Sequence, residues 1–265
     1  TRFGFTDHDC ELAFEGWRFK AGTGLTARAL SQATGLSVDN SEARGALSDS
    51  SLREDDILAG RFDGANLRCW LVNWQKTEQR WLQFRGTLGE LRRAGGAFEV
   101  ELRGLTEELN RPLGRVFQTP CTAVLGDKSC GFDLTAAGYS YVVPVAELDQ
   151  EGHFTWSELP GFEPEWFNGG RLTVLDGAAQ GLWGMIKRDQ SFTGHRSLTL
   201  WEPIKAGIKP GDQLRLDAGC DKRMETCRLK FNNLLNYQGF PDIPGEDWVM
   251  AVPRQSGVNT GGSRR

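Results

Sequence analysis

Apolar and polar residues alternate along much of the first half of the chain, and this alternation is typical of half-buried β-strands. Residues 10–22, CELAFEGWRFKAG, place Leu12 and Phe14 on one strand and Trp17 and Phe19 on the next, with a turn at Glu15-Gly16. Further strands are predicted in residues 65–74, 80–93 and 95–105.

Two short helices are expected around these strands. Residues 48–60, SDSSLREDDILAG, combine a capping serine with acidic residues in the first turn. Residues 105–117 form a second helical pattern, which Pro112 should interrupt because proline cannot continue the helical hydrogen bonds.

The alternating pattern returns after residue 138 and predicts a second set of strands in residues 139–148, 153–156, 170–177, 181–189, 196–204 and 212–219. The apolar residues of 224–236 then follow helical spacing, and residues 254–265 are polar and glycine-rich, as in a flexible tail. We therefore expect a mainly β protein with two β-sandwich or barrel-like modules and a few short helices. The expected division is residues 1–115, residues 116–253 and a tail of residues 254–265.

Composition narrows the classes of function. The hydrophobic share is 39%, the charged share 25% and the net charge −4, so no basic surface for nucleic acid or anionic membranes is indicated. No apolar run approaches the roughly 18 residues that a membrane span needs, and no export signal is visible. Neither a phosphate-binding glycine loop nor a nucleophile elbow occurs, so we expect no catalysis.

Four cysteines form two pairs that lie far apart in the sequence. Eight residues separate Cys121 from Cys130, six separate Cys220 from Cys227, and 89 strand-like residues lie between the pairs. If that segment folds compactly, its two ends bring the pairs together. Thiolates are ligands for zinc, copper(I) and iron–sulfur clusters. Structural zinc usually takes ligands from knuckles with two to four intervening residues, so these longer spacings favour a cluster.

Two alternatives remain open from spacing alone: a disulfide, and inert buried cysteines. The sequences GDK at residues 126–128 and DKR at residues 221–223 lie inside the two pairs, where basic groups would offset the charge of a cluster. Cys10 and Cys69 lie in strand-like segments, where inert packing is expected.

The chain resembles the tail hub proteins of gene transfer agents and related siphophages over nearly its whole length. The resemblance is carried at the N-terminal side by GFTDHD (4–9), GLSVDN (35–40), DDILAGRFDGA (55–65), LVNW and LRGLTEEL. At the C-terminal side it is carried by PCTAVLGDKSCGFDL and CDKRMETCRLKFNNLLNYQGFPDIPG, and this part is also similar to the cysteine-bearing end of minor tail protein L of lambda-type phages.

The resemblance implies a [4Fe–4S] cluster held by Cys121, Cys130, Cys220 and Cys227. It also implies a homotrimeric, non-enzymatic hub of the virion tail tip, assembled in the bacterial cytoplasm. The hub would join a distal tail protein or hexameric tail-tube ring to a larger tail-tip, fibre or peptidase-associated protein, and would line the DNA exit path without sequence-specific DNA binding. The strap, which we define as residues 231–248, would be fixed against the β module by the cluster.

Two other classes of function compete with this interpretation. TDHD, residues 6–9, invites a hydrolytic metal site in a cell-wall hydrolase, although aspartates capping a turn at the start of a strand explain it better. Phe162, Trp166 and Phe167, in the loop of residues 158–170, suit carbohydrate or receptor binding, although packing against a neighbouring subunit is favoured.

Overall fold

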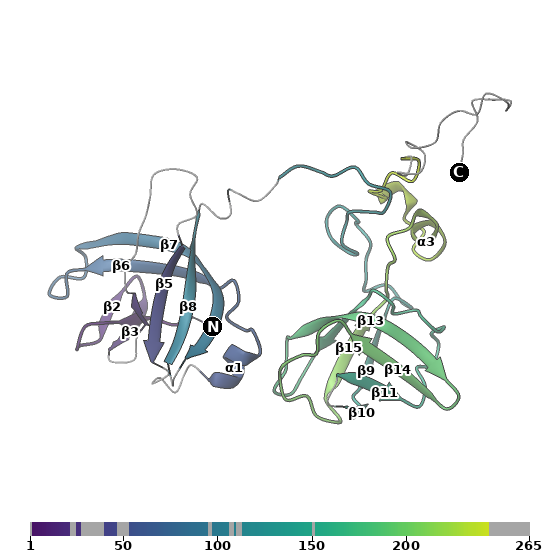
Figure 1. Ribbon diagram of the computed structural model, residues 1–265, viewed down its shortest axis with the longest axis horizontal. Coiled ribbons are helices and arrows are strands. Elements are labelled where there is room, and N and C mark those ends of the chain that lie inside the picture. The colour runs from purple at the N-terminus through teal and green to yellow at the C-terminus, as the bar shows by residue number, and fades with distance from the viewer. Residues whose placement is uncertain are drawn as a thin grey trace. The chain divides into compact units, whose positions relative to one another are not determined.

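The computed structural model of the chain describes residues 2–21, 25–27, 40–46, 53–94, 97–105, 109, 113–149 and 152–243. The chain forms two compact units. The first reaches Leu113 and the second begins at Gly114, while Lys205–Gly207 are grouped with the first. Nearly all regular structure in both units is β-strand (Figure 1). The prediction of a mainly β chain with few helices is therefore confirmed.

The first unit contains two sheets. Its five-stranded antiparallel sheet has the order β4-β5-β8-β7-β6, with the bounds β4 Leu25–Ala27, β5 Asn40–Ala46, β6 Asn66–Val72, β7 Arg80–Ala94 and β8 Ala97–Gly104. Its three-stranded sheet has the order β1-β3-β2, with the bounds β1 Phe5–Thr6, β2 Leu12–Phe14 and β3 Trp17–Ala21. Phe84, Val100 and Leu102 are fully buried and belong to the core of this unit.

The structure matches the predicted hairpin closely and the predicted first helix only in part. Glu15 and Gly16 both have positive φ, 53° and 75°, as a two-residue hairpin turn between β2 and β3 requires. Helix α1, Glu54–Leu58, begins after Arg53, which makes no side-chain capping hydrogen bond. The prediction that a serine caps this helix was therefore wrong. In the second expected helix, Leu105 and Leu109 are helical and residues 113–117, after Pro112, are not, as the interruption at Pro112 predicts; the other residues of that segment lie outside the described ones.

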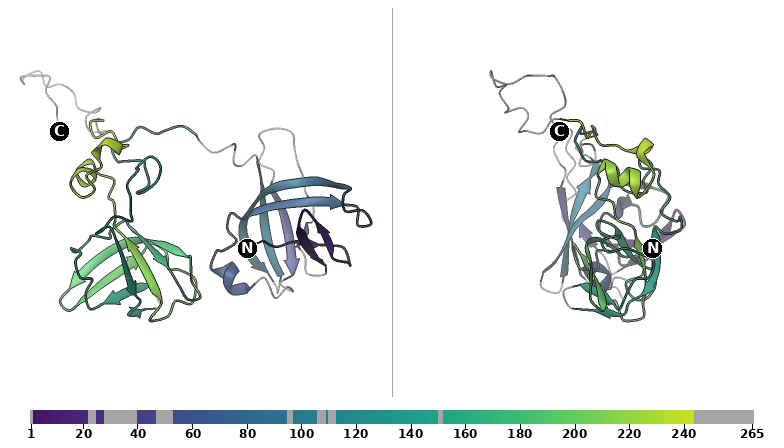
Figure 2. Two further views of the ribbon diagram at one scale, coloured as in Figure 1. Left: turned by 180° about the vertical axis from the view of Figure 1, so that it is seen from behind. Right: turned by 90° about the vertical axis from the view of Figure 1, so that its right-hand side faces the viewer.

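The second unit is one seven-stranded antiparallel sheet of order β10-β11-β14-β13-β12-β15-β9 (Figures 1 and 2). Its strands are β9 Ser140–Pro144, β10 Glu147–Leu148, β11 His153–Trp156, β12 Arg171–Val174, β13 Trp183–Phe192, β14 His195–Leu200 and β15 Gln213–Asp217. One face of the sheet is buried by alternate residues such as Leu172, Ile186, Leu198, Leu214 and Leu216, each with 0% exposure. The alternation seen in the sequence therefore specifies the core of this unit.

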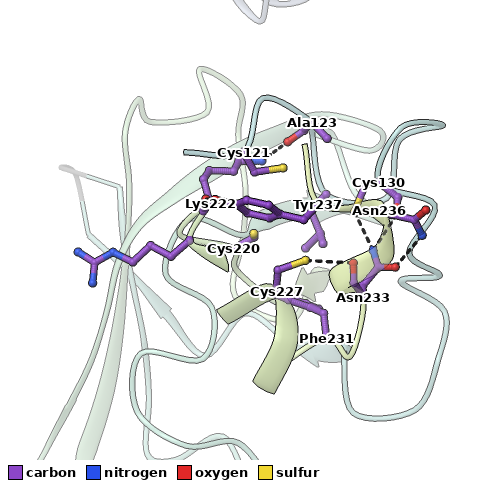
Figure 3. A pocket seen from close by; sticks show the side chains of 12 residues that line it. Cys121, Ala123, Cys130, Cys220, Lys222, Cys227, Phe231, Asn233, Asn236 and Tyr237 are labelled. Atoms are coloured by element: carbon purple, nitrogen blue, oxygen red, sulfur yellow. Dashed lines mark hydrogen bonds between the residues drawn. The ribbon is translucent and has the colours of Figure 1, made fainter. Parts of the chain in front are cut away.

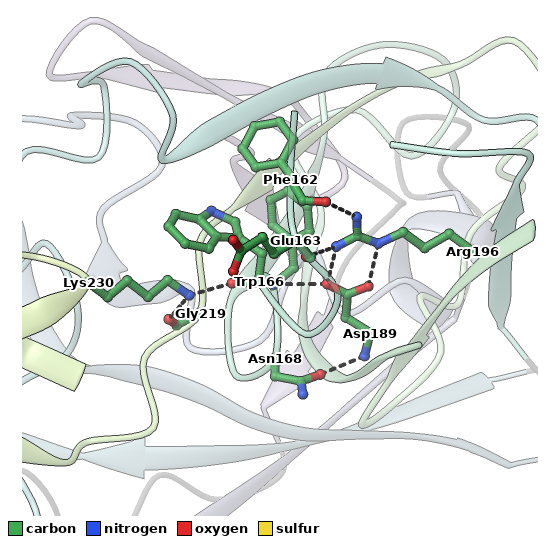
Figure 4. A network of polar contacts seen from close by, with 9 residues as sticks. Phe162, Glu163, Trp166, Asn168, Asp189, Arg196, Gly219 and Lys230 are labelled. Atoms are coloured by element: carbon green, nitrogen blue, oxygen red, sulfur yellow. Dashed lines mark hydrogen bonds and ion pairs between the residues drawn. The ribbon is translucent and has the colours of Figure 1, made fainter. Parts of the chain in front are cut away.

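A buried ion pair lies within this apolar core. A β-bulge between Ile186 and Arg188 shifts the register of β13 and turns Asp189 inward. Asp189 has 0% and Arg196 4% exposure, and their side chains are joined by two hydrogen bonds of 2.7 Å (Figure 4). Arg196 also donates to the carbonyls of Phe162 and Glu163, at 2.7 and 2.6 Å. The pair thereby anchors the loop of residues 158–170 to the sheet.

The aromatic residues of this loop pack within their own unit. Phe167 is fully buried and lies 5.0 Å from the ring of Phe162, which in turn lies 5.2 Å from Tyr141. The ring centres of Trp166 and Tyr139 lie 6.2 Å apart, and Lys230 Nζ lies 4.2 Å from the ring centre of Trp166. The expectations that these rings bind sugars or a neighbouring subunit were therefore wrong for Phe167, and the other two rings already have internal partners.

The helix expected over residues 224–236 is shorter than its apolar spacing indicated. Helix α3 covers Met224–Leu229, and a 3-10 turn follows at Leu234–Asn236. Asn232 between them adopts φ of +47°, a left-handed conformation that a helix does not continue through. Within the described residues, no helix is long and apolar enough to cross a membrane.

Candidate metal centre

Two neighbouring strands bring the distant cysteine pairs together. β9 and β15 are antiparallel, with Ser140 opposite Asp217, and the ladder is extended by the backbone N–H of Ala218 donating to Tyr139 at 2.8 Å. The loop before β9 carries Cys121 and Cys130, and the segment after β15 carries Cys220 and Cys227. Because the strands are antiparallel, both segments emerge at the same end of the sheet, where Figures 1 and 2 show them side by side with α3.

Asp127 shapes the loop between the first two cysteines. Its carboxylate accepts the backbone N–H groups of Val124, Ser129 and Cys130 at 3.0, 2.9 and 2.6 Å. The Cys130 N–H is the main reason that the pKa of the Asp127 carboxyl lies below its usual value. Gly126 precedes it with φ of +82°, which suits the tight turn. This turn fixes the position from which the Cys130 side chain extends.

The second pair is held by a short helix and its entry turn. Cys220 follows β15, and Cys227 lies in α3 with 9% exposure. Asp221 accepts hydrogen bonds from the N–H of Arg223 and the hydroxyl of Thr226, at 3.0 and 2.9 Å, and so closes the turn that leads into the helix. Lys222, with φ of +66°, joins the two cysteine segments: its carbonyl accepts the Cys121 N–H at 2.9 Å.

The four cysteines line one pocket. Its walls include Lys222, Arg223 and Phe231, and Figure 3 shows the four cysteine side chains around the same space. Lys222 Nζ donates to the carbonyl of Ala123 at 2.5 Å, whereas Lys128 is not among the lining residues. The predicted basic side chains at the pocket therefore come from the segment of the second cysteine pair, Lys222 and Arg223, and not from that of the first.

The surroundings of Cys220 and Cys227 favour the protonated form of these two thiols. Burial raises the pKa of Cys220, and burial together with the neighbouring thiols raises the pKa of Cys227. Metal ligation needs thiolates, so a metal that binds here must displace these protons.

The strap closes the pocket from the C-terminal side. Tyr237 donates its hydroxyl to the carbonyls of Thr119 and Lys222, at 3.0 and 3.3 Å, and the backbone N–H of Gln238 lies 3.4 Å from Cys121 Sγ. Burial is the largest cause of the raised pKa of Tyr237. Residues 244–248 of the strap lie outside the described residues. The described part links the loop of the first pair to the helix of the second.

The donor set consists of four thiols, which suit metal groups that take soft ligands. A tetrahedral ion with Zn–S bonds of about 2.3 Å needs sulfurs about 3.8 Å apart. In the described part of the chain, three ligand atoms within 4.8 Å of one another occur at His8, Asp9 and Cys10, but not among the four pocket thiols. As placed, these thiols therefore do not have the spacing of one tetrahedral zinc site.

The TDHD motif forms a surface bend between β1 and β2, so it lies before a strand as expected. The backbone N–H of His8 donates to the Thr6 hydroxyl at 3.2 Å, and His8 Nδ1 accepts the N–H of Cys10 at 3.0 Å. Thr6 and His8, not the aspartates as expected, therefore cap this bend. Cys10 is exposed, which contradicts its expected inert packing, whereas Cys69 is half-buried in β6, with its pKa raised by burial.

Two residues of the site were missed by sequence reasoning. Asn233 donates through its side chain to the carbonyl of Cys130 at 2.7 Å, and Lys230 Nζ donates to the carbonyls of Trp166 and Gly219 at 2.6 and 2.9 Å (Figures 3 and 4). Burial lowers the pKa of Lys230. Both residues lie inside residues 224–236, where the apolar spacing predicted a continuous helix and gave no signal of these contacts.

Comparison with known proteins gives the family of the chain. Residues 1–133 match the family "Baseplate hub protein, N-terminal attachment domain", and residues 165–247 match "Phage conserved hypothetical protein BR0599". No curated protein matches the chain. A chain in the solved virion of a native gene transfer agent (GTA) particle is 52% identical, with a TM-score of 0.88 over 98% of this chain and 90% of that chain. The chain therefore belongs to the baseplate hub protein family.

Proposed function

We propose that the protein is the structural hub of a phage-like tail tip, a role that needs no enzymatic activity. Membership of the baseplate hub family makes it a structural component of the virion tail. The 52% identity to a chain of a gene transfer agent virion, over nearly the whole length of both chains, supports the same assembly role. The hub joins a distal tail protein or tail-tube ring on one side to a larger tip or fibre protein on the other, and it lines the path of the DNA.

The two β units of one chain suit a trimer at this junction. Three copies of a two-unit chain present six β units, which matches a six-fold ring above and a three-fold tip below. The mass of the isolated protein by light scattering tests this arrangement. A particle of about three times 29.4 kDa is expected, and a strictly monomeric chain at micromolar concentration contradicts the trimer.

The same proposal gives the second unit a [4Fe–4S] cluster. The observation that carries it is the single pocket lined by Cys121, Cys130, Cys220 and Cys227. A cluster bound there supplies a covalent cross-link between the two ends of the β module. Since the site is assembled only in the folded chain, the free energy of binding adds to the stability of the fold. The role of the cluster is therefore structural.

Metal analysis of anaerobically purified protein tests the cluster. About four irons and four acid-labile sulfides per chain are expected, with the broad visible absorption of an iron–sulfur centre. One zinc without sulfide would keep the four-cysteine site and reject the cluster. Replacing Cys227 by serine should lower the melting temperature of the loaded protein, and an unchanged melting temperature would reject the structural role.

A further inference from the structure

One asparagine contacts two of the proposed cluster ligands that lie 97 positions apart in the sequence, Cys130 and Cys227. We propose that Asn233 is the positioning residue of this centre: it fixes Cys130 relative to Cys227 and tunes the reduction potential of the bound group through a hydrogen bond to sulfur. This inference rests on the proposed cluster.

The side chain of Asn233 reaches the first cysteine pair. Its Nδ2 donates to the carbonyl oxygen of Cys130 at 2.7 Å and lies 3.5 Å from Cys130 Sγ (Figure 3). Its Oδ1 accepts a hydrogen bond from Asn236 Nδ2 at 2.8 Å. Because the oxygen already faces a donor, the amide is oriented with its two N–H groups toward Cys130.

The backbone of Asn233 holds the second pair. Its N–H donates to the carbonyl of Cys227 at 3.0 Å, and its carbonyl oxygen lies 3.3 Å from Cys227 Sγ. The left-handed conformation of Asn232 reverses the chain after α3 and returns Asn233 to Cys227. Both the side chain and the backbone of this residue are therefore used, and only a short side chain with two amide donors makes all of these contacts.

These contacts have different consequences when a metal group binds. The Cys227 thiol donates its proton to the Asn233 carbonyl, and this proton leaves to solvent when the sulfur becomes a ligand. The N–H of Asn233 that faces Cys130 Sγ remains a donor and stabilises negative charge on that sulfur. Hydrogen bonds to the sulfurs raise the reduction potential of a cluster, so loss of this donor lowers it.

The test compares two isosteric variants, Asn233→Asp and Asn232→Asp. Both add one negative charge, but Asn232 is exposed, is not among the residues that line the pocket, and has a left-handed conformation that aspartate also adopts. For Asn233→Asp we expect a more negative reduction potential and iron loss to a chelator that is about tenfold faster, as for other residues that orient metal ligands. Asn232→Asp should match the wild type in both measurements, and the thermal unfolding of both metal-free variants is recorded alongside.

The outcomes separate this inference from the proposed function. Wild-type protein without iron and sulfide overturns the proposed cluster and this inference, and leaves the hub role in place. A loaded wild type with Asn233→Asp indistinguishable from Asn232→Asp overturns the role of Asn233 and leaves the cluster in place. If Asn233→Asp does not fold, Asn236→Ala decides, because it releases the Asn233 amide without changing residue 233. Faster iron loss than in Asn232→Asp then supports the inference, and an equal rate overturns it.

Discussion

Replacing Asp189 by asparagine tests the most deeply buried polar contact of the second unit. The carboxylate has no exposed surface and accepts two hydrogen bonds of 2.7 Å from Arg196 and one of 3.0 Å from the N–H of Phe167. Asparagine keeps the shape but leaves the guanidinium buried without its counter-charge. Removing one partner of a buried ion pair costs about 3–5 kcal/mol.

This magnitude converts into a measurable change of melting temperature. For a unit of this size, 1 kcal/mol lowers the melting temperature by about 2–4 °C, so Asp189→Asn should lower it by about 6–20 °C. Asp176→Asn is the matched control, because Asp176 is an exposed carboxylate of the same unit and asparagine retains an oxygen for its hydrogen bond from the Gln213 N–H. Surface changes of this kind stay within about 0.5 kcal/mol.

The assay is thermal and urea unfolding followed by tryptophan fluorescence, on samples with equal metal content. Because the chain has two units, the transition of the second unit is read separately if the two do not coincide. A free energy of unfolding for Asp189→Asn within 1 kcal/mol of the Asp176→Asn value would refute the reasoning, since it would mean that water reaches the Arg196 guanidinium.

Three further predictions concern the metal centre. Tyr237→Phe removes the hydroxyl whose one proton is shared between the carbonyls of Thr119, before the first pair, and Lys222, inside the second pair. Urea unfolding should show a loss of about 1 kcal/mol; no change would contradict the contacts. A Cβ on Gly219 would overlap a backbone carbonyl, so Gly219→Ala should reduce the bound iron, whereas Gly207→Ala, with open space around it, should not. Because the pKa values of Cys220 and Cys227 are raised, protons compete with the metal for these sulfurs. The fraction of iron that the protein retains against a chelator should therefore decrease as the pH is lowered from about 8 to about 6; a retention that does not change with pH would contradict this.

Much of the fold follows from the sequence because strand alternation reports burial directly. Leu12, Phe14, Trp17 and Phe19 predicted the first hairpin, and the turn residues Glu15-Gly16 lie where two positive φ angles are needed. The cysteine spacing left a metal site, a disulfide and inert burial open, and the pairing of β9 with β15 places the two pairs at one end of the sheet.

The parts that the sequence did not reveal depend on single backbone irregularities. Period-two reasoning places Arg188 on the buried face, but a bulge after Ile186 gives this position to Asp189. The apolar spacing of residues 224–236 continues past Asn232, although its left-handed φ ends the helical path. The role of Asn233 depends on this reversal, so it could not be predicted from periodicity.

The neighbouring position of β9 and β15 also has a consequence for the order of folding. These are the first and last strands of the second unit, so their ladder forms only after the whole segment between them has been synthesised and has closed a long loop. The four thiols meet only once this ladder exists. Loading of the proposed cluster would therefore require a completed unit, because a chain that lacks either strand does not bring the four thiols together.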